Sequence, residues 1–113
     1  MVELLVGQLG ADVDRANKDG WTPAYVAAFE GHLEVVKVLI EKGADLDRAT
    51  NDGATPTYVA AEEGDSEIVE LLVGKGADVD RARDDGSTPT FIAAQNGHSE
   101  VVKLLVDLSL IHI

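Results

Sequence analysis

The side chains of this chain that could act as metal ligands or general bases are few and poorly grouped. His32 and His98 each follow a glycine and lie far apart in the sequence, and His112 lies next to the last residue. None has a second histidine three or four residues away, the spacing that lets one helix present two ligands to a metal. We therefore expect His32 and His98 to bond to nearby backbone rather than to bind a metal or move a proton.

Carboxylates are abundant, but their spacing is not that of a metal-binding loop. Six aspartates stand in pairs with one residue between them: Asp12 and Asp14, Asp45 and Asp47, Asp78 and Asp80. A calcium loop needs a denser set of oxygens, a glycine at its bend and a glutamate at its end. The pairs therefore indicate turn chemistry and solubility, since aspartate side chains bond readily to backbone N–H groups two residues on.

Other catalytic arrangements are missing from the sequence. There is no cysteine, hence no thiol nucleophile and no cysteine-ligated metal. The serines lack the glycine-flanked setting of a nucleophile elbow, and no glycine-rich phosphate loop is present. The sequence predicts that the protein is not an enzyme and uses no metal or cofactor.

The charge balance and the apolar runs exclude further classes. The chain has 9 Lys and Arg against 21 Asp and Glu, a formal net charge of −12. Phosphate backbones and anionic membrane surfaces select for Lys and Arg clusters, so we expect neither nucleic acid nor membrane as a partner. No apolar run approaches the roughly 20 residues of a membrane span, and the first residues lack a basic region and a cleavage pattern. We expect a cytoplasmic protein.

What positions these side chains is a tandem repeat of 33 residues. Four sequence markers recur at this interval without a slip. They are Gly-Ala-Asp at Gly10, Gly43 and Gly76; Asp-Gly at Asp19, Asp52 and Asp85; Thr-Pro at Thr22, Thr55 and Thr88; and Ala-Ala at Ala27, Ala60 and Ala93. One period shared by four markers predicts an array of like units rather than a single central core.

Each unit predicts two short helices and a turn. In the first, 17–20 is a turn, and Thr22 and Pro23 suit the N-cap and the first helical position. One helix is expected over 23–30 and a second over 33–41, where apolar and polar residues occupy opposite faces. Helices of this length are marginal alone, so they must stack on neighbours.

These residues resemble the ankyrin repeat. The pattern Asp-Gly-x-Thr-Pro-x-x-x-Ala-Ala, followed by Gly-Ala-Asp-(Val/Leu)-Asp, runs in register over residues 10–106. The resemblance implies an all-α solenoid of stacked helix–turn–helix units with projecting β-turn or hairpin loops. The family commonly has Leu-His after Thr-Pro, whereas this chain has Ala24-Tyr25, Thr57-Tyr58 and Thr90-Phe91. A small residue at the leucine position thins the core, and we hypothesise that the following aromatic fills the lost volume.

The period also divides the chain. We expect a partial repeat holding only a second helix at 1–9, repeats at 10–42, 43–75 and 76–108, the last truncated in its last helix, and a tail at 109–113. The stretch Leu108–Ile113 resembles the translation of an adapter sequence used in DNA library preparation, so we expect the tail, starting near residue 108, to be foreign to a truncated reading frame. The alternative is a short natural tail covering the last helix.

The resemblance implies binding of a protein or peptide partner by loop tips and by the concave face of the first helices. The matching positions are Lys18, Asp19, Trp21, Phe29, Glu30, Asn51, Asp52, Ala54, Glu62, Glu63, Asp84, Asp85, Ser87, Gln95 and Asn96. The units differ from one another at several of these positions, which favours a recognition surface; the alternative is neutral surface drift, which gives the same pattern.

Trp21 and Phe29 are the expected apolar anchor of that surface. They would lie beside an acidic strip, Asp52, Glu62, Glu63, Asp84 and Asp85, which predicts a partner with a basic patch. The alternative for Trp21 is a side chain that covers the neighbouring loop. We expect a monomeric protein–protein interaction module; the alternative is the recognition fragment of a larger ankyrin-containing enzyme, channel or secreted effector.

Overall fold

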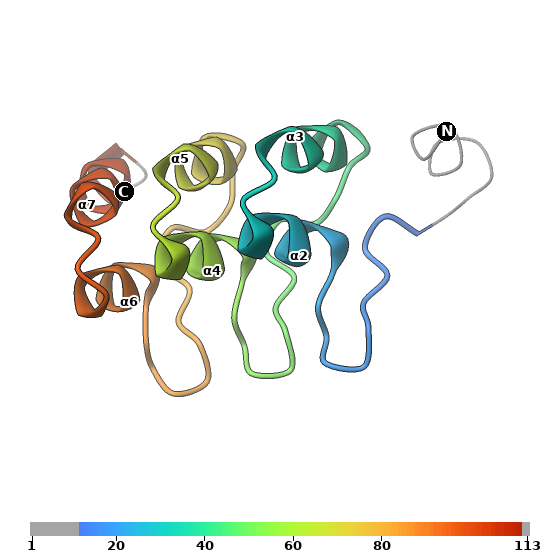
Figure 1. Cartoon of the computed structure of the whole chain (residues 1–113), viewed down its shortest axis with the longest axis horizontal. Helices are drawn as coiled ribbons and strands as arrows, with labels where there is room; N and C mark the ends of the chain where they lie inside the picture. The colour runs from blue at the N-terminus through green and yellow to red at the C-terminus, as the bar shows by residue number, and fades with distance from the viewer. Residues whose placement is uncertain (1–11, 112–113) are drawn as a thin grey trace.

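The computed structural model describes residues 12–111, and all regular structure within that range is helical. The helices are α2 (Pro23–Glu30), α3 (Leu33–Glu41), α4 (Pro56–Glu63), α5 (Ser66–Gly74), α6 (Pro89–Gln95) and α7 (Ser99–Ile111). Figure 1 shows them as three stacked pairs: α2, α4 and α6 form one row, α3, α5 and α7 form another, and the loops project from the first row. The expected solenoid of helix–turn–helix units is confirmed.

The first helix of each unit begins at the predicted threonine. The hydroxyl of Thr22 accepts the backbone N–H of Tyr25 at 3.2 Å, and Thr55 and Thr88 cap α4 and α6 in the same way. Proline follows each cap, where its missing N–H has no helical partner to lose. Gly31 ends α2 in the left-handed conformation with φ 76°. The predicted bounds 23–30 and 33–41 are both confirmed.

The second helices end at glycine in two units but continue in the third. After α3, Gly43 donates to the carbonyl of Ile40 and Ala44 to that of Leu39, which together form a Schellman motif. Gly76 and Ala77 repeat this motif after α5. The third unit has Ser109 at the glycine position, and α7 runs on to Ile111. Helix therefore continues through Ser109 and Leu110, within the segment that the sequence divided off as a tail.

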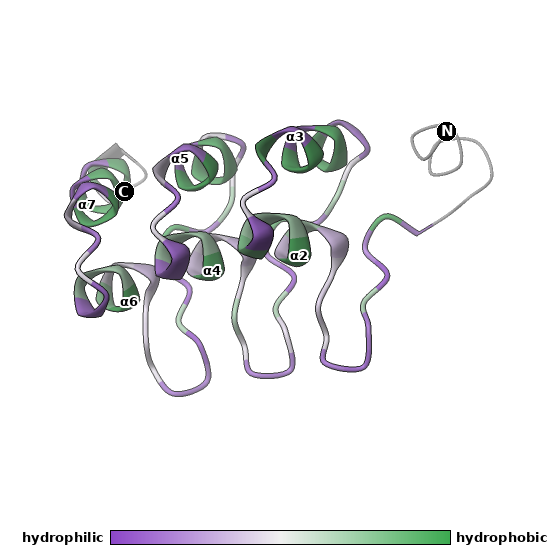
Figure 2. Ribbon diagram, viewed as in Figure 1, coloured by the Kyte–Doolittle hydropathy of each residue, from purple (hydrophilic) through white to green (hydrophobic). Residues whose placement is uncertain are grey.

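The apolar side chains pack between neighbouring units and do not form a single central core. The middle unit is covered on both sides, and its Tyr58, Val59, Val69 and Val73 are at most 1% exposed. The alanine pair Ala60-Ala61 is fully buried, which lets neighbouring helices approach closely. Figure 2 shows hydrophobic residues gathered on the helices and hydrophilic ones at the loop tips.

The projecting loops are tied to one another by backbone bonds. Asn51 donates its backbone N–H to the carbonyl of Asp19, and Asp84 donates to that of Asp52, at 3.0 and 2.9 Å. Gly53 has φ 84°, and a Cβ there would lie 2.9 Å from the backbone nitrogen of Asp84. Only glycine permits both this conformation and this approach, so the loops form a closely spaced row.

No helix in residues 12–111 combines the length and apolar character that a membrane crossing requires.

Candidate functional site

An aromatic stripe runs from the first loop along α2. The Trp21 ring lies 4.8 Å from the Tyr25 ring and 5.4 Å from the Phe29 ring, measured between centroids. These residues are spaced four apart, so they lie on one side of the helix. Phe29 is 38% exposed and Trp21 is half-buried. Trp21 therefore packs along its own helix, and the stripe leaves an aromatic surface open at Phe29.

The same stripe changes character in the following units. At the position of Trp21, the second unit has Ala54, which is 3% exposed and offers no side-chain surface to a partner. At the position of Phe29, it has Glu62, which is half-buried, and the third unit has the exposed Gln95. At the position of Phe29 the stripe thus changes from aromatic at α2 to acidic at α4 and polar at α6, while Phe91 of α6, at the position of Tyr25, is 56% exposed.

Arg83, which was not among the predicted site residues, adds a positive charge to this face. Its guanidinium lies 5.2 Å from the centroid of the Tyr58 ring and donates to the Asp85 carboxylate at 2.6 Å. This hydrogen bond holds the pKa of Asp85 well below its usual range and raises the pKa of Arg83. The sequence signal that could have found it is the variation at one loop position, which reads Asn17, Thr50 and Arg83 in the three units.

The two tyrosine hydroxyls of this face lie in poorly solvated surroundings. Burial, together with the negative charge of Glu62, raises the pKa of Tyr25 to about 12. Burial also raises the pKa of Tyr58, whose hydroxyl is enclosed without a well-placed hydrogen-bond partner, although Ser87 lies near enough to lower that pKa. Neither phenol is activated as a proton carrier near neutral pH, so these groups shape the surface and do not perform acid–base chemistry.

Several predicted contact residues are engaged in holding the loops and helix ends together. Asn51 donates its side-chain amide to the carbonyl of Lys18 at 2.9 Å, and Asn96 donates to the carbonyl of Glu62 at 3.1 Å. Asp85 bonds to Arg83 and also accepts the backbone N–H of Ser87. The remaining predicted residues with exposed side chains are Lys18, Asp19, Glu30, Asp52, Glu63 and Asp84.

The His98 ring and the paired aspartates bond to backbone groups, and the carbonyl that His98 contacts belongs to the preceding unit rather than to its own turn. The ring Nε2 of His98 lies 3.0 Å from the carbonyl of Glu62, while His32 is exposed at the other end of the stack. Asp45 accepts the N–H of Asp47, as the turn interpretation predicts. Sequence reasoning missed the second role of these aspartates: Asp47 accepts the N–H of Asp78 in the next unit at 2.8 Å. Within residues 12–111, no three His, Asp or Glu side chains gather as a metal site would require.

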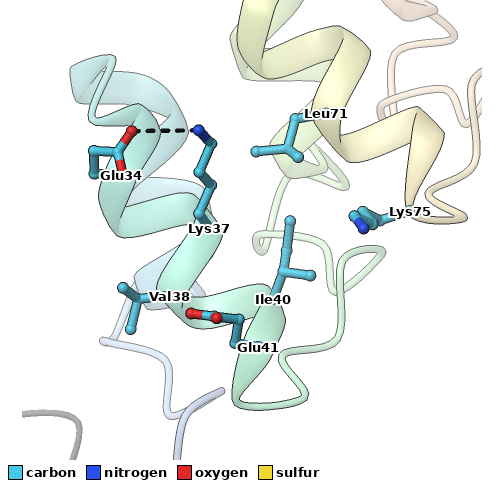
Figure 3. A pocket seen from close by; sticks show the side chains of 7 residues that line it. All are labelled: Glu34, Lys37, Val38, Ile40, Glu41, Leu71 and Lys75. Carbon is cyan, nitrogen blue, oxygen red and sulfur yellow. Dashed lines mark hydrogen bonds and ion pairs between the residues drawn. The ribbon is translucent and has the colours of Figure 1, made fainter.

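A separate groove of about 440 Å³ lies between α3 and α5, away from the loops. Figure 3 shows Ile40 and Leu71 beside it, with Lys37 paired to Glu34 at 3.3 Å on its rim. None of the groups with a shifted pKa lines it. Its lining includes charged side chains of both signs, Glu34, Lys37, Glu41 and Lys75, and it stands apart from the aromatic and acidic face.

Comparison with known proteins agrees with this geometry. The family model for ankyrin repeats in three copies matches residues 1–83, and the model for a single ankyrin repeat matches residues 85–111. The Notch-regulated ankyrin repeat-containing proteins of human and mouse are each 50% identical over 42 residues, and that of Xenopus tropicalis is 48% identical. Each match covers 37% of this chain and 36% of the relative, so it spans about a third of the relatives' length.

Proposed function

Because this chain belongs to the ankyrin-repeat family, we propose that it is a protein–protein interaction module that binds its partner through the loop tips and the inner face of α2, α4 and α6. Ankyrin repeats generally serve in protein interaction. In this proposal, the chain acts as a monomer in the cytoplasm. The face described above binds the partner, and no residue acts in catalysis.

The observation that carries the proposal is where the units differ. The capping threonines, prolines and alanine pairs repeat unchanged, whereas one stripe reads Trp21, Ala54, Ser87 and another reads Phe29, Glu62, Gln95. Both stripes belong to the face that the first helices share with the loops. Phe29 is a large apolar side chain that remains exposed there and packs against Trp21. Aromatic side chains in such settings are frequent anchors of protein interfaces.

Charge favours a basic partner. The acidic strip Asp52, Glu62, Glu63, Asp84 and Asp85 lies on this face, and Arg83 is already bonded to Asp85. An acidic surface steers positively charged segments toward it and speeds their association. We therefore propose a protein or peptide that brings Lys or Arg side chains to the strip and an apolar side chain to Phe29.

A selection experiment tests the proposed module. A displayed random-peptide library is selected against the chain, and the binding of each selected peptide is measured on the wild type, Phe29→Ala and Val38→Ala. Val38 lines the groove between α3 and α5, so its variant is the matched control. We expect enrichment of peptides with basic residues and at least about tenfold weaker binding to Phe29→Ala alone. Selected peptides that bind both variants as tightly as the wild type would contradict the proposed face.

A further inference from the structure

The groove between α3 and α5 lies on the outer row of helices and has no part in the proposed function. Its volume of about 440 Å³ is within the size range of ligand sites. Its apolar lining consists of Val38 and Ile40 from α3 and Leu71 from α5, and all three side chains are half-buried. Figure 3 shows Ile40 and Leu71 beside the groove and Lys75 on its α5 side. The groove is therefore an accessible apolar surface with a charged edge.

The equivalent position in the next pair of helices carries a leucine. Counting forward 33 residues, Ile40 becomes Val73 and Lys75 becomes Leu108. Val73 is fully buried, whereas Ile40 is only half-buried. Leu108 belongs to α7, which contacts α5, and its side chain packs against the core that includes Val73. The groove between α3 and α5 thus has the surroundings that take a leucine in the next unit, but it has a lysine at the leucine's position.

Lys75 leaves the apolar lining uncovered because its charged end stays in water. Its side chain is exposed, and the ammonium group makes no hydrogen bond or ion pair with residues 12–111. Lys37, the other cation of the groove, is bonded to Glu34 at 3.3 Å. Lys75 therefore offers an unpaired positive charge at the edge of the apolar lining.

The charges on the two sides of the groove differ. Glu34 and Glu41 belong to α3, whereas Lys75 directly follows α5. Glu34 is balanced by Lys37, but Glu41 has no ion pair within the described residues. A carboxylate that enters the groove would be repelled on the α3 side and attracted on the α5 side.

We propose that the groove receives an aliphatic side chain of leucine size from a partner protein, and that a carboxylate next to this side chain bonds to Lys75. The partner would fill the place that Leu108 fills in the next unit and would supply the anion that Lys75 lacks. None of the residues that line the groove belongs to the inner face of α2, α4 and α6. The inference therefore goes beyond the proposed function and names a second docking surface.

Three synthetic peptides test the groove directly. The probe is the blocked peptide Gly-Ser-Leu-Glu-Ser-Gly. One control has alanine in place of leucine, and the other has glutamine in place of glutamate. The methyl NMR signals of Val38, Ile40 and Leu71 report on occupancy. We expect the probe to shift these signals with a Kd on the order of 1 mM, and each control to bind at least about threefold more weakly. An alanine control that binds as tightly as the probe would overturn the proposal.

The glutamine control separates Lys75 from the field of the whole chain. The formal net charge of −12 repels a negatively charged peptide, so general electrostatics would favour the neutral glutamine peptide. Tighter binding of the glutamate peptide must then come from a nearby cation. Equal or weaker binding of the glutamate peptide would overturn the proposal.

Two variants at one position test whether the groove has room for a leucine. Lys75→Leu fills the groove from within the chain, and Lys75→Gln removes the same charge without filling it. We expect Lys75→Leu to raise the melting temperature by roughly 5 °C and to lose binding of the probe. Lys75→Gln should melt within about 2 °C of the wild type and bind the glutamate and glutamine peptides equally. If Lys75→Leu were no more stable than Lys75→Gln, the proposal would be overturned. Circular dichroism checks that each variant folds, and the peptide comparison on the wild type does not depend on them.

The outcomes for the groove and for the inner face are independent. Phe29→Ala, which tests the inner face, should bind the probe as tightly as the wild type does. Failure of the probe to bind in the groove would overturn this inference and leave the inner face standing, and library peptides that bind independently of Phe29 would do the reverse.

Discussion

Two buried hydroxyl groups in the central unit have no well-placed hydrogen-bond partner. Thr57 and Tyr58 are at most 1% exposed, and neither hydroxyl has such a partner among the described residues. A buried polar group without a hydrogen-bond partner lowers the free energy of unfolding by on the order of 1–3 kcal/mol. Thr57 occupies the place where the resembled family commonly has leucine, so the chain combines a smaller side chain with an unmet polar atom there.

Replacing Thr57 by valine should therefore stabilise the protein. The Thr57→Val side chain has nearly the same shape and removes the unpaired hydroxyl, so we expect the free energy of unfolding to rise by about 1 kcal/mol in urea denaturation. The matched control is Thr55→Val, because the Thr55 hydroxyl caps α4 by accepting the N–H of Tyr58 at 3.1 Å. That variant should lose about 1 kcal/mol. If both variants were more stable than the wild type, or both less stable, this account would be contradicted.

The ion pair of Arg83 and Asp85 should make the stability of the protein depend on pH. Arg83 lowers the pKa of Asp85 in the folded protein below its value in the unfolded chain. The pair therefore contributes stability above about pH 4, and this contribution is lost as the pH falls through the folded pKa. Arg83→Met should raise the pKa of Asp85 toward its usual value, as measured by carboxyl-carbon NMR titration. Arg81→Met removes the same charge without touching Asp85 and should leave that pKa unchanged.

At the scale of the element, the helices are short but sharply bounded. Threonine caps and prolines start the first helices, and glycines end most helices by adopting the left-handed conformation. These are local signals, so the sequence predicted the bounds of α2 and α3 to the residue. Where Ser109 stands in place of the glycine, α7 has no stop and continues by four residues beyond the position at which α3 and α5 end.

The loops are elements of the stack in their own right, because aspartates link each to the next. Asp47 accepts the N–H of Asp78 at 2.8 Å, whereas its equivalent in the third unit, Asp80, makes no such bond within residues 12–111. Asp47→Ala should lower the free energy of unfolding by about 1 kcal/mol. Asp80→Ala makes the same change at the equivalent position and should have an effect within about 0.5 kcal/mol. Equal losses in the two variants would show that these carboxylates act locally rather than between units.

At the scale of the whole molecule, the stack decides which of several equivalent side chains is buried. Tyr58 is 1% exposed because the third unit covers it, but its equivalent Phe91 is 56% exposed. Val35 is 48% exposed, whereas its equivalent Ile68 is fully buried against the first unit. Stability is therefore concentrated at the interfaces between units, as the repeat architecture implies.

Truncating two equivalent aromatic side chains tests whether stability is concentrated at the interfaces between units. It also tests the hypothesis that an aromatic side chain fills the volume of the leucine that the family commonly has. Tyr58→Ala should lower the free energy of unfolding by about 3–5 kcal/mol, as for other large buried side chains. Phe91→Ala, at the equivalent exposed position, should lower it by about 1 kcal/mol. Denaturant titration of both variants checks the contrast. An unchanged melting temperature for Tyr58→Ala would refute the volume-filling role.

The net charge of −12 predicts how association depends on salt. Screening shortens the reach of the acidic strip, with a Debye length of about 10 Å at 0.1 M salt. For a basic peptide bound at the proposed face, raising the salt from about 50 mM to about 500 mM should slow association by roughly tenfold and change dissociation less. Stopped-flow measurement of both rate constants checks this. An association rate that is insensitive to salt would show that the acidic strip does not steer the partner.

The sequence predicted the aromatic and acidic residues of the proposed interaction surface, but not their burial or their hydrogen-bond partners. Trp21, Phe29 and Glu62 were recognised because they vary at fixed positions of the repeat. That Ala54 is buried, and that Asn51 and Asn96 bond to the preceding unit, depends on distances between residues 33 or 34 positions apart. Arg83 was missed because its partners, Tyr58 and Asp85, come from two different units.

The sequence by itself determined the period and the bounds of the first two helices, since caps, prolines and glycines act within a few residues, but it did not predict that α7 continues to Ile111. Only the tertiary structure decided which copy of each position is buried, which carboxylates are paired and where a cation is seated. The physical reason is that a repeat gives every unit the same local signals, while burial and charge pairing depend on the neighbour that each unit contacts. Tyr58 with Arg83 and Tyr25 with Thr50 occupy equivalent positions, but a guanidinium lies over the Tyr58 ring, whereas the residue equivalent to Arg83 in the second unit is the buried Thr50.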